Sequence, residues 1–177
     1  MRDCWLRKPD YKGKLVRGGR FGGLKGVAMK IVIGCDHAAF RLKEIVRDRL
    51  TAQGIEVTDL GAFSEDSVDY PRIGSDVAAR VSRGEFARGI LMCGTGLGMS
   101  MVANRFAHVR AALCNDLFAA MMSRRHNDAN ILVMGGRVVG DILALEIVRT
   151  WLETPFEGGR HQKRLDMFDC PEDVSGT

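Results

Sequence analysis

The chain has 177 residues, of which 46% are hydrophobic and 27% charged, with 26 Lys+Arg against 22 Asp+Glu. This length predicts one domain with a substantial core, and the balance of apolar and charged residues excludes wholesale disorder. No window approaches the roughly 18 uninterrupted apolar residues of a membrane-spanning helix, so we expect no membrane partner. The formal net charge of +4 raises the question of a nucleic-acid partner, which depends on where the charge lies.

The positive charge is concentrated at the N-terminus. Residues 1–28 carry eight basic and two acidic side chains, whereas the rest of the chain carries 18 basic and 20 acidic ones. The segment is rich in glycine and lacks the apolar stretch of a secretory signal. We predict that residues 1–28 are a disordered or untranslated extension, that 29–170 form the domain and that 171–177 are a tail. A targeting peptide and a basic nucleic-acid arm are the alternatives for 1–28.

The five cysteines are widely spaced and include no C-x-x-C pair. An odd number of cysteines without a signal peptide predicts reduced thiols in the cytoplasm rather than a disulfide framework. The spacing also excludes a zinc finger or ribbon.

From Lys30 onward, short apolar runs alternate with amphipathic stretches. The predicted strands are 31–33, 55–60, 89–92, 109–113 and 130–134, and the predicted helices are 40–50, 73–81, 97–106, 116–125 and 141–152. Repeated βα units of this length predict an α/β fold, a three-layer Rossmann-like sandwich with a five-stranded parallel sheet. Ligands of such sheets bind outside the carboxyl ends of the strands.

Glycine and polar residues follow several predicted strands, and we expect them to gather at one rim of the sheet. They are Asp36 and His37 after the first strand, 93–100 after the third, Asn115 and Asp116 after the fourth with 123–127 at the end of the next helix, and 135–137 after the fifth. Such a rim is how an α/β ligand site is built.

The loop Cys93-Gly94-Thr95-Gly96-Leu97-Gly98 is the sharpest single signal. Its glycines let the backbone approach a ligand, and the amides that open the following helix favour an anion. Met99 excludes a dinucleotide-binding loop and an arginine-containing phosphatase loop, and Gly98-Met99-Ser100 lacks the lysine of a Walker loop. Cys93 is either a buried strand end or a reactive thiolate, because a helix N-terminus lowers a thiol pKa from about 8.5. We favour the thiolate.

Other candidates have two interpretations each. His126 is either a surface histidine at a helix C-terminus or a site residue, and His37 is better placed at a strand end. The run 158–164 is either a solvated basic turn or a phosphate clamp, since arginine binds phosphate bidentately. The sequence Asp-Tyr-Pro at 69–71 is either a simple turn or a segment that presents Tyr70 to a ligand.

Six short motifs follow one another along the chain. They are Gly-Cys-Asp-His at 34–37, Asp-Tyr-Pro at 69–71, Cys-Gly-Thr-Gly-x-Gly at 93–98, Ser-Arg-x-His-Asn-Asp-x-Asn at 123–130, Gly-Arg at 136–137 and Gly-Gly-Arg-His-x-x-Arg at 158–164. Together, over residues 29–168, they closely resemble ribose-5-phosphate isomerase type B, in a family that also includes galactose-6-phosphate isomerase subunits. Residues 1–28 have no counterpart in that pattern.

The resemblance implies interconversion of ribose 5-phosphate and ribulose 5-phosphate through a cis-enediolate, without a metal or another cofactor. It implies that Cys93 transfers the proton, that Thr95 and the neighbouring amides hold the enediolate, and that His126 opens the sugar ring. The substrate-binding residues implied are Asp36, Tyr70, Asn127 and Arg137 for the sugar, His37, Arg160 and Arg164 for the phosphate, and Gly94, Gly96, Gly98 and Ser100 around the loop.

The resemblance also implies a homodimer, or a dimer of dimers, with sites shared between subunits. Motifs 34–37 and 93–98 of one subunit would face motifs 126–137 and 158–164 of the other. We expect no nucleic-acid partner for the domain. The alternative functions are isomerisation of a hexose phosphate, such as allose 6-phosphate or galactose 6-phosphate, and a non-catalytic sugar-phosphate-binding subunit.

Overall fold

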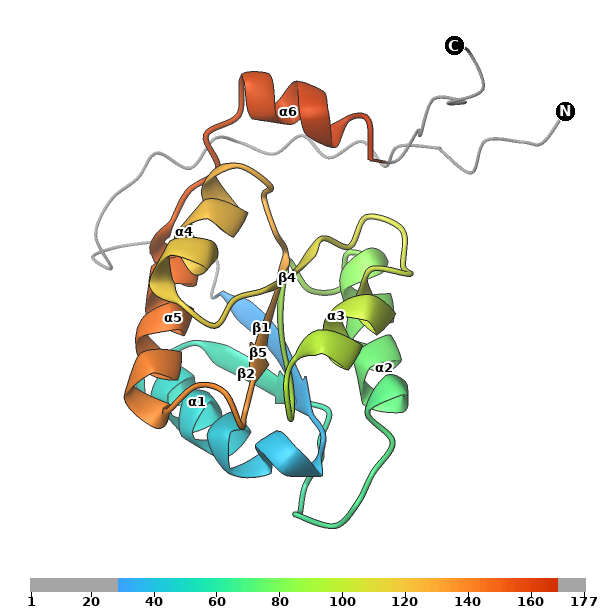
Figure 1. Ribbon diagram of the computed structural model, residues 1–177, viewed down its shortest axis with the longest axis vertical. Coiled ribbons are helices and arrows are strands. Elements are labelled where there is room, and N and C mark those ends of the chain that lie inside the picture. The colour runs from blue at the N-terminus through green and yellow to red at the C-terminus, as the bar shows by residue number, and fades with distance from the viewer. Residues whose placement is uncertain (1–28, 169–177) are drawn as a thin grey trace, which may run out of the picture.

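The computed structural model describes residues 29–168 and contains a five-stranded sheet between two layers of helices (Figure 1). The extension 1–28 and the tail 171–177 predicted from the sequence lie outside the described residues, as do Cys4 and Cys170. The strands are β1 Lys30–Cys35, β2 Glu56–Asp59, β3 Arg88–Cys93, β4 Ala111–Leu113 and β5 Ile131–Gly135. The main helices are α1 Phe40–Ala52, α2 Tyr70–Ser82, α3 Leu97–Ala103, α4 Leu117–Arg125, α5 Asp141–Glu153 and α6 Arg160–Leu165, with a short 3-10 turn at His37–Ala39.

All four strand pairings are parallel, and the strand order is β2-β1-β3-β5-β4. The prediction of a five-stranded parallel sheet is therefore confirmed. The three central strands are β-branched or apolar along nearly their whole length and are buried on both faces, as expected of a sheet covered by helices on both sides.

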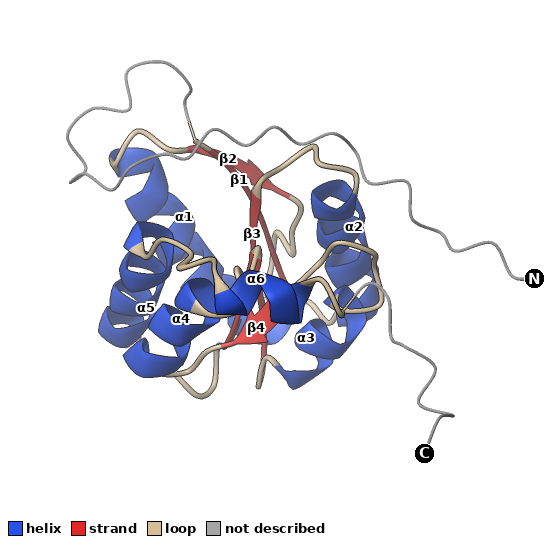
Figure 2. Ribbon diagram, turned by 90° about the horizontal axis from the view of Figure 1, so that it is seen from above, coloured by secondary structure: helices blue, strands red, loops and turns tan. Residues whose placement is uncertain are grey.

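Helices α1, α4 and α5 cover one face of the sheet, and α2 and α3 cover the other (Figure 2). Each face has its own core, one built around Trp151, Leu50 and Ile147 and the other around Val77, Leu91 and Met99. In the described part of the chain, no helix is long and apolar enough to cross a membrane.

The bounds of the predicted elements shift in the structure, and three of them show why. Helix α2 starts at Tyr70 rather than at Ile73, because Pro71 is accommodated in the first turn of a helix. Helix α3 ends at Ala103 rather than at Phe106, and β4 has only three residues; Nδ2 of the Asn104 side chain donates to the carbonyl of Ala111 and joins the two elements.

Helix α6 is missing from the sequence prediction, which treated 158–164 as a turn or a clamp. Its six residues have no long apolar stripe, and only His161 and Leu165 are buried. With so few apolar positions, the helical period could not be detected along the sequence.

The strand order places a topological switch point between β1 and β3. From β1 the chain passes to β2 on one side, whereas from β3 it passes toward β4 and β5 on the other. In doubly wound sheets the crevice at this point, outside the carboxyl ends of the strands, binds the ligand. The two segments that line it here are the one after β1, with Asp36 and His37, and the loop after β3, with Cys93.

Candidate active site

The carboxyl edge of the sheet carries a group of predicted site residues that we call the carboxyl-edge cluster: Asp36, His37, Tyr70, residues 93–98 and Arg137. Backbone hydrogen bonds join its segments. The amide of Asp36 donates to the carbonyl of Met92 at 3.1 Å, and the amide of Arg137 donates to the carbonyl of Gly94 at 3.0 Å. The segments after β1, β3 and β5 are thus held together by the sheet itself.

Cys93 ends β3 and is only 5% exposed. Its Sγ accepts a hydrogen bond from the amide of Gly96 at 3.2 Å, and its carbonyl accepts one from the amide of Gly136 at 2.8 Å. These two bonds hold Cys93 against the glycine loop and the segment after β5, so its sulfur lies directly before the first turn of α3.

The other two buried thiols of the described chain, Cys35 and Cys114, lie in the core on one face of the sheet. Burial raises the pKa of Cys35 to about 12 and that of Cys114 to about 11. Both remain protonated at neutral pH, so they are structural core residues.

The glycines around Cys93 are required by the backbone. Gly96 has a φ of +81°, in the left-handed region, and a Cβ there would lie 2.4 Å from Cδ1 of Leu113. A Cβ on Gly135 would lie 2.8 Å from the carbonyl carbon and oxygen of Thr95, because the loop passes directly against β5. The loop conformation is thereby locked before any ligand binds.

The remaining members of the carboxyl-edge cluster line this loop. Asp36 is buried, and its Oδ1 accepts a hydrogen bond from the amide of Ala38 at 3.0 Å. Nδ1 of His37 accepts one from the amide of Val68 at 3.3 Å, and the ring of Tyr70 lies directly against Gly98. Oγ1 of Thr95 accepts a long hydrogen bond from the amide of Leu97 at 3.4 Å.

The hydroxyl of Ser100 donates to the carbonyl of Leu97 at 2.8 Å, so it bonds within its own helix.

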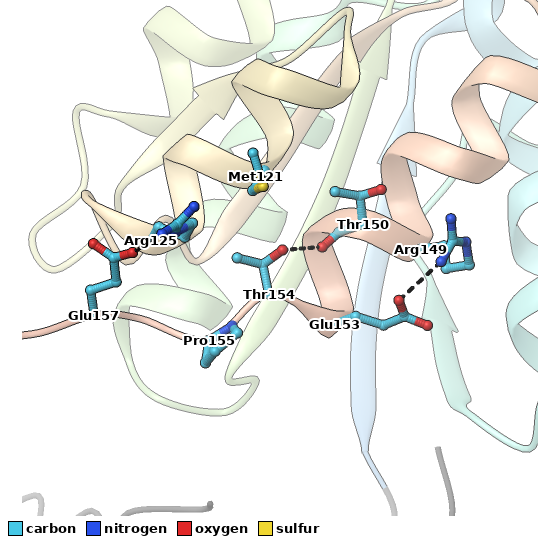
Figure 3. Close-up of a pocket in the computed structure, with 8 residues that line it drawn as sticks. All are labelled: Met121, Arg125, Arg149, Thr150, Glu153, Thr154, Pro155 and Glu157. Carbon is cyan, nitrogen blue, oxygen red and sulfur yellow. Dashed lines mark hydrogen bonds and ion pairs between the residues drawn. The ribbon is translucent and has the colours of Figure 1, made fainter. Parts of the chain in front are cut away.

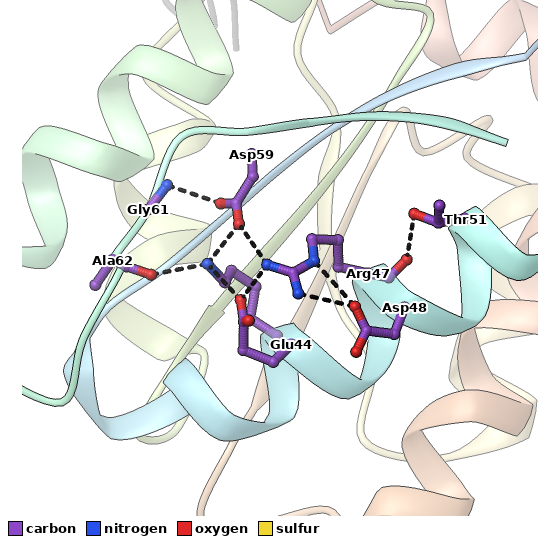
Figure 4. Close-up of polar contacts among 8 residues, drawn as sticks. Glu44, Arg47, Asp48, Thr51, Asp59, Gly61 and Ala62 are labelled. Atoms are coloured by element: carbon purple, nitrogen blue, oxygen red, sulfur yellow. Dashed lines mark hydrogen bonds and ion pairs between the residues drawn. The ribbon is translucent and has the colours of Figure 1, made fainter.

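Lys43 was not among the site residues expected from the sequence. Its side chain holds the segment that leads to Tyr70 in place. Its fully buried ammonium group donates to Oδ2 of Asp59 at 2.6 Å and to the carbonyl of Ala62 at 2.8 Å, beside Phe63. Figure 4 shows Asp59 and Ala62 on this segment and the ion pairs of Arg47 around it. A buried lysine on an otherwise amphipathic helix gives no signal in a sequence, because its partners come from β2 and the following loop.

His126 lies at the opposite edge of the sheet. Helix α4 starts beyond the carboxyl end of β4 and returns the chain to the amino edge, where β5 begins. A strand of five residues spans about 17 Å, so within one chain His126 cannot meet Cys93. The expectation that residues 123–127 share the rim of Cys93 is wrong for a single chain, because a helix that follows a strand runs antiparallel to it.

At that edge the structure forms a second group, the amino-edge cluster: Arg125, His126, Glu157, Arg160 and His161. The imidazoles of His126 and His161 are stacked, with centroids 4.1 Å apart and planes inclined by 8°. Oε2 of Glu157 lies 3.7 Å from Nε2 of His126 and 3.5 Å from Nε2 of His161.

Charges in the amino-edge cluster influence one another. Nε of Arg125 donates to Oε1 of Glu157 at 2.5 Å, and this bond lowers the pKa of the carboxyl group. The pKa of His161 is lowered, first by burial and then by the positive charges of His126 and Arg160. Glu157 was not found from the sequence, although its spacing of four residues from His161 was an available signal.

Two further predicted residues lie near the amino-edge cluster. The carbonyl of Asn127 accepts a hydrogen bond from Nε of Arg110 at 3.0 Å. Arg164 is exposed on α6, one turn after Arg160. Arg137, in contrast, lies beside Gly94 of its own chain and so belongs to the carboxyl edge. Within one chain Arg137 and His126 therefore lie at opposite edges of the sheet.

A groove of about 540 Å³ lies between α4 and the C-terminal end of α5 (Figure 3). Its two arginines are both paired with glutamates of the groove, Arg125 with Glu157 and Arg149 with Glu153. The groove therefore offers no excess positive charge to a phosphate, and we place the candidate active site at the Cys93 crevice instead.

The fold defines a class of protein: α/β proteins with a parallel five-stranded sheet covered by helices on both faces, which bind their ligands at the switch point of the sheet. The described chain matches the Ribose/Galactose Isomerase family over residues 31–168. The chain therefore belongs to the ribose/galactose isomerase family.

Individual relatives agree with this assignment. The chain is 49% identical to ribose-5-phosphate isomerase B of Escherichia coli, over 81% of this chain and 96% of that protein. It is 42% identical to a D-erythrulose-4-phosphate isomerase of Pectobacterium atrosepticum, over 78% of this chain and 91% of the relative. The solved structure of Clostridium thermocellum ribose-5-phosphate isomerase B is similar, with a TM-score of 0.79 and 52% identity over 80% of this chain and 95% of that one.

Proposed function

We propose that this protein interconverts ribose 5-phosphate and ribulose 5-phosphate, with Cys93 as the base that moves a proton between C1 and C2. The observation that carries the proposal is the Cys93 thiol at the switch point, with the amide of Gly96 directed at its sulfur. The identity of 49% and 52% to two ribose-5-phosphate isomerases B supports the choice of substrate.

The chemistry follows from this geometry. The thiolate of Cys93 removes the proton from C2 of the open-chain aldose, and the electron pair forms the C1–C2 double bond of a cis-enediolate. The charge develops on O1, where the hydroxyl of Thr95 and the amides of the 93–98 loop stabilise it. Reprotonation at C1 by Cys93, with transfer of the hydroxyl proton from O2 to O1, gives the ketose.

The carboxyl-edge cluster lacks two functions that this reaction needs, a group that opens the furanose ring and a full phosphate anchor. The amino-edge cluster contains His126 and the exposed Arg160, and the exposed Arg164 lies beside it on α6. We infer that two chains pair so that the amino-edge cluster of one completes the carboxyl-edge cluster of the other. In this arrangement His126 opens the ring, Arg160 and Arg164 bind the phosphate with His37, and Arg137 orients the sugar.

The test is an isomerase assay with ribose 5-phosphate on the wild type and on Cys93→Ala, with Cys114→Ala as the buried-thiol control. Loss of the base should lower kcat by about 10²- to 10⁴-fold while circular dichroism remains unchanged. Cys114→Ala should keep the activity, because that thiol lies in the core away from the crevice. Wild-type activity in Cys93→Ala would refute the role of the thiol.

Substrate size needs a separate comparison, because the family also includes galactose isomerases and one relative acts on a four-carbon sugar phosphate. We expect kcat/KM to be higher for ribose 5-phosphate than for allose 6-phosphate, galactose 6-phosphate or erythrulose 4-phosphate. A preference for any of the other three would change the substrate but leave the proton transfer in place. Absence of turnover with all four, with retained sugar-phosphate binding, would identify a non-catalytic binding subunit.

A further inference from the structure

The proposed reaction gives a role to His126 but leaves Glu157 and His161 without one. Oε2 of Glu157 lies 3.7 Å from Nε2 of His126 and 3.5 Å from Nε2 of His161. The three residues come from the end of α4, the segment between α5 and α6, and α6 itself, so only folding brings them together. A carboxylate beside a histidine that transfers protons is the arrangement by which active sites orient an imidazole.

The carboxylate of Glu157 is ionised and has a fixed orientation. Arg125 contacts its Oε1 through Nε and Nη2, so Oε2 is the oxygen that faces the two imidazoles. The hydrogen bond from Arg125 also lowers the pKa of Glu157, so the group is an anion at neutral pH. An ionised carboxylate only accepts hydrogen bonds, and Oε2 therefore favours a ring nitrogen that carries a hydrogen.

Of the two imidazoles, His126 is the one that can supply this hydrogen. Nε of Arg160 donates to Nε2 of His161 at 3.5 Å, so this nitrogen is an acceptor. Burial, and then the positive charges of His126 and Arg160, lower the pKa of His161, so its ring is neutral at pH 7. A neutral imidazole has one donor and one acceptor nitrogen, which places the hydrogen of His161 on Nδ1. Nε2 of His126 remains as the donor toward Glu157.

The ring of His126 is held in place but stays accessible. It stacks on the buried ring of His161, with centroids 4.1 Å apart and planes inclined by 8°. The His126 side chain is 39% exposed, so a substrate can still reach it. The separation of 3.7 Å from Glu157 is longer than a hydrogen bond, but such catalytic contacts are often long in the free enzyme and shorten when substrate binds.

We propose that Glu157 is a positioning residue for the opening of the sugar ring. It holds His126 in the tautomer with the hydrogen on Nε2, so that the electron pair of Nδ1 is directed at the substrate. The proposal rests on the proposed function, in which His126 of one chain opens the ring that is bound at the carboxyl edge of another.

The ring opens by transfer of a single proton. Nδ1 of His126 takes the proton of the O1 hydroxyl, the electron pair left on O1 forms the C1=O1 double bond, and the C1–O4 bond breaks with its electron pair on O4. The same proton then passes from Nδ1 to O4, which gives the open-chain aldehyde and restores the neutral imidazole. Between the two transfers His126 is a cation, and the negative charge of Glu157 stabilises it.

Glu157→Gln tests the tautomer, because it keeps the size of the side chain and reverses the hydrogen bond. Arg125 can only donate, so it should hold the amide oxygen and leave the amide NH₂ to donate to Nε2 of His126. The matched control is Glu153→Gln, since Glu153 pairs with Arg149 in the neighbouring groove.

Nuclear magnetic resonance of ¹⁵N-labelled histidine rings measures the tautomer. The chain has four histidines, and comparison with His126→Asn assigns the signals of His126. At pH 8.5, above the ordinary imidazole pKa of about 6.5, the hydrogen should be on Nε2 in the wild type and in Glu153→Gln. It should be on Nδ1 in Glu157→Gln. The same tautomer in all three proteins would overturn the proposal.

Two kinetic assays separate ring opening from the proton transfer at carbon. Ribose 5-phosphate is almost entirely a closed ring, whereas ribulose 5-phosphate cannot form a furanose because its O5 carries the phosphate. Isomerisation of ribose 5-phosphate therefore needs ring opening, but exchange of a C1 hydrogen of ribulose 5-phosphate with solvent deuterium needs only Cys93.

Glu157→Gln should lower kcat/KM for ribose 5-phosphate by roughly tenfold to a hundredfold, at the low end for an acid–base group because rings also open in solution. Its deuterium exchange should stay within about threefold of the wild type, because the base at the carbon is intact. Glu153→Gln should match the wild type in both assays, and Cys93→Ala should lose both activities.

Other results would overturn this role of Glu157. Equal losses of isomerisation and deuterium exchange in Glu157→Gln would show a general structural role, and wild-type isomerisation would show no role in ring opening. A wild type that neither isomerises ribose 5-phosphate nor exchanges deuterium would refute the proposed function and with it the role in ring opening. A reversed tautomer in Glu157→Gln would then still assign the orientation of His126 to Glu157.

Discussion

The two edges of the sheet hold their functional groups in different ways. At the carboxyl edge, Cys93 is 5% exposed and is fixed by backbone hydrogen bonds and by glycines that no other residue can replace without a clash. At the amino edge, the His126 side chain is 39% exposed and is held by a stack and by long contacts to one glutamate. In the function that we propose, proton transfer therefore uses groups of a single chain, whereas ring opening and phosphate binding use a surface that meets a partner chain.

The first prediction separates the thiol of the carboxyl edge from the core thiols. At pH 8, Cys35 and Cys114 have pKa values raised to about 12 and about 11, so only roughly 10⁻⁴ and 10⁻³ of each is thiolate. Their alkylation should begin only as the pH rises toward those values. Iodoacetamide at pH 8 should label Cys93 and spare both, and ribose 5-phosphate should protect Cys93.

Peptide mass spectrometry measures this labelling. Modification of Cys35 at the rate of Cys93 would contradict the distinction between a functional and a structural thiol.

The second prediction tests how much the buried contacts of Lys43 with Asp59 and Ala62 contribute to the free energy of unfolding. Lys43→Met leaves the carboxylate of Asp59 and the carbonyl of Ala62 without their buried cation, which should lower the free energy of unfolding by about 3 kcal/mol. The matched control is Lys30→Met, whose exposed ion pair with Glu56 joins β1 and β2 and should contribute less than about 1 kcal/mol. Urea denaturation measures both, and equal losses would show that burial of the Lys43 pair is unimportant.

The third prediction tests whether the carboxyl edge of one chain and the amino edge of another chain form one active site. Cys93→Ala and His126→Asn should each be nearly inactive alone. Co-refolded in equal amounts, they should regain about a quarter of wild-type activity, because half of the dimers are mixed and each has one intact site of two. A mixture no more active than its components would place the whole site within one chain.

The fourth and smallest effect concerns Tyr70. A Cβ on Gly98 would lie 2.6 Å from the Tyr70 ring, which must shift. Gly98→Ala should therefore raise KM for ribose 5-phosphate by roughly threefold to tenfold with little change in stability. Gly140→Ala is the control, because nothing lies within 4 Å of its Cβ position and its φ is −80°. Equal KM values in the two variants would mean that Tyr70 does not position the substrate.

Much of this molecule could be predicted from local patterns. The runs 31–33, 89–92 and 130–134 are apolar throughout, and they form the three central strands because such strands are buried on both faces. The glycines of the loop 93–98 were also recognised locally, and in the structure a Cβ on Gly96 or Gly98 would lie 2.4 Å or 2.6 Å from a neighbouring side chain; their role in binding a ligand stays a prediction. The sequence did not predict helix α6 or the roles of Lys43 and Glu157, because their positions depend on contacts between residues that are distant in the chain.

The sequence by itself determined the alternation of strands and helices, the thiol and glycine loop after the third strand, and the motifs of the ribose/galactose isomerase family. Only the tertiary structure decided which motifs share an edge. Long-range strand pairing put β5 between β3 and β4, so Arg137 lies beside Gly94, and the reversal of direction in α4 carried His126 to the other edge. These outcomes depend on pairings between residues far apart in the sequence, which local periodicity does not encode.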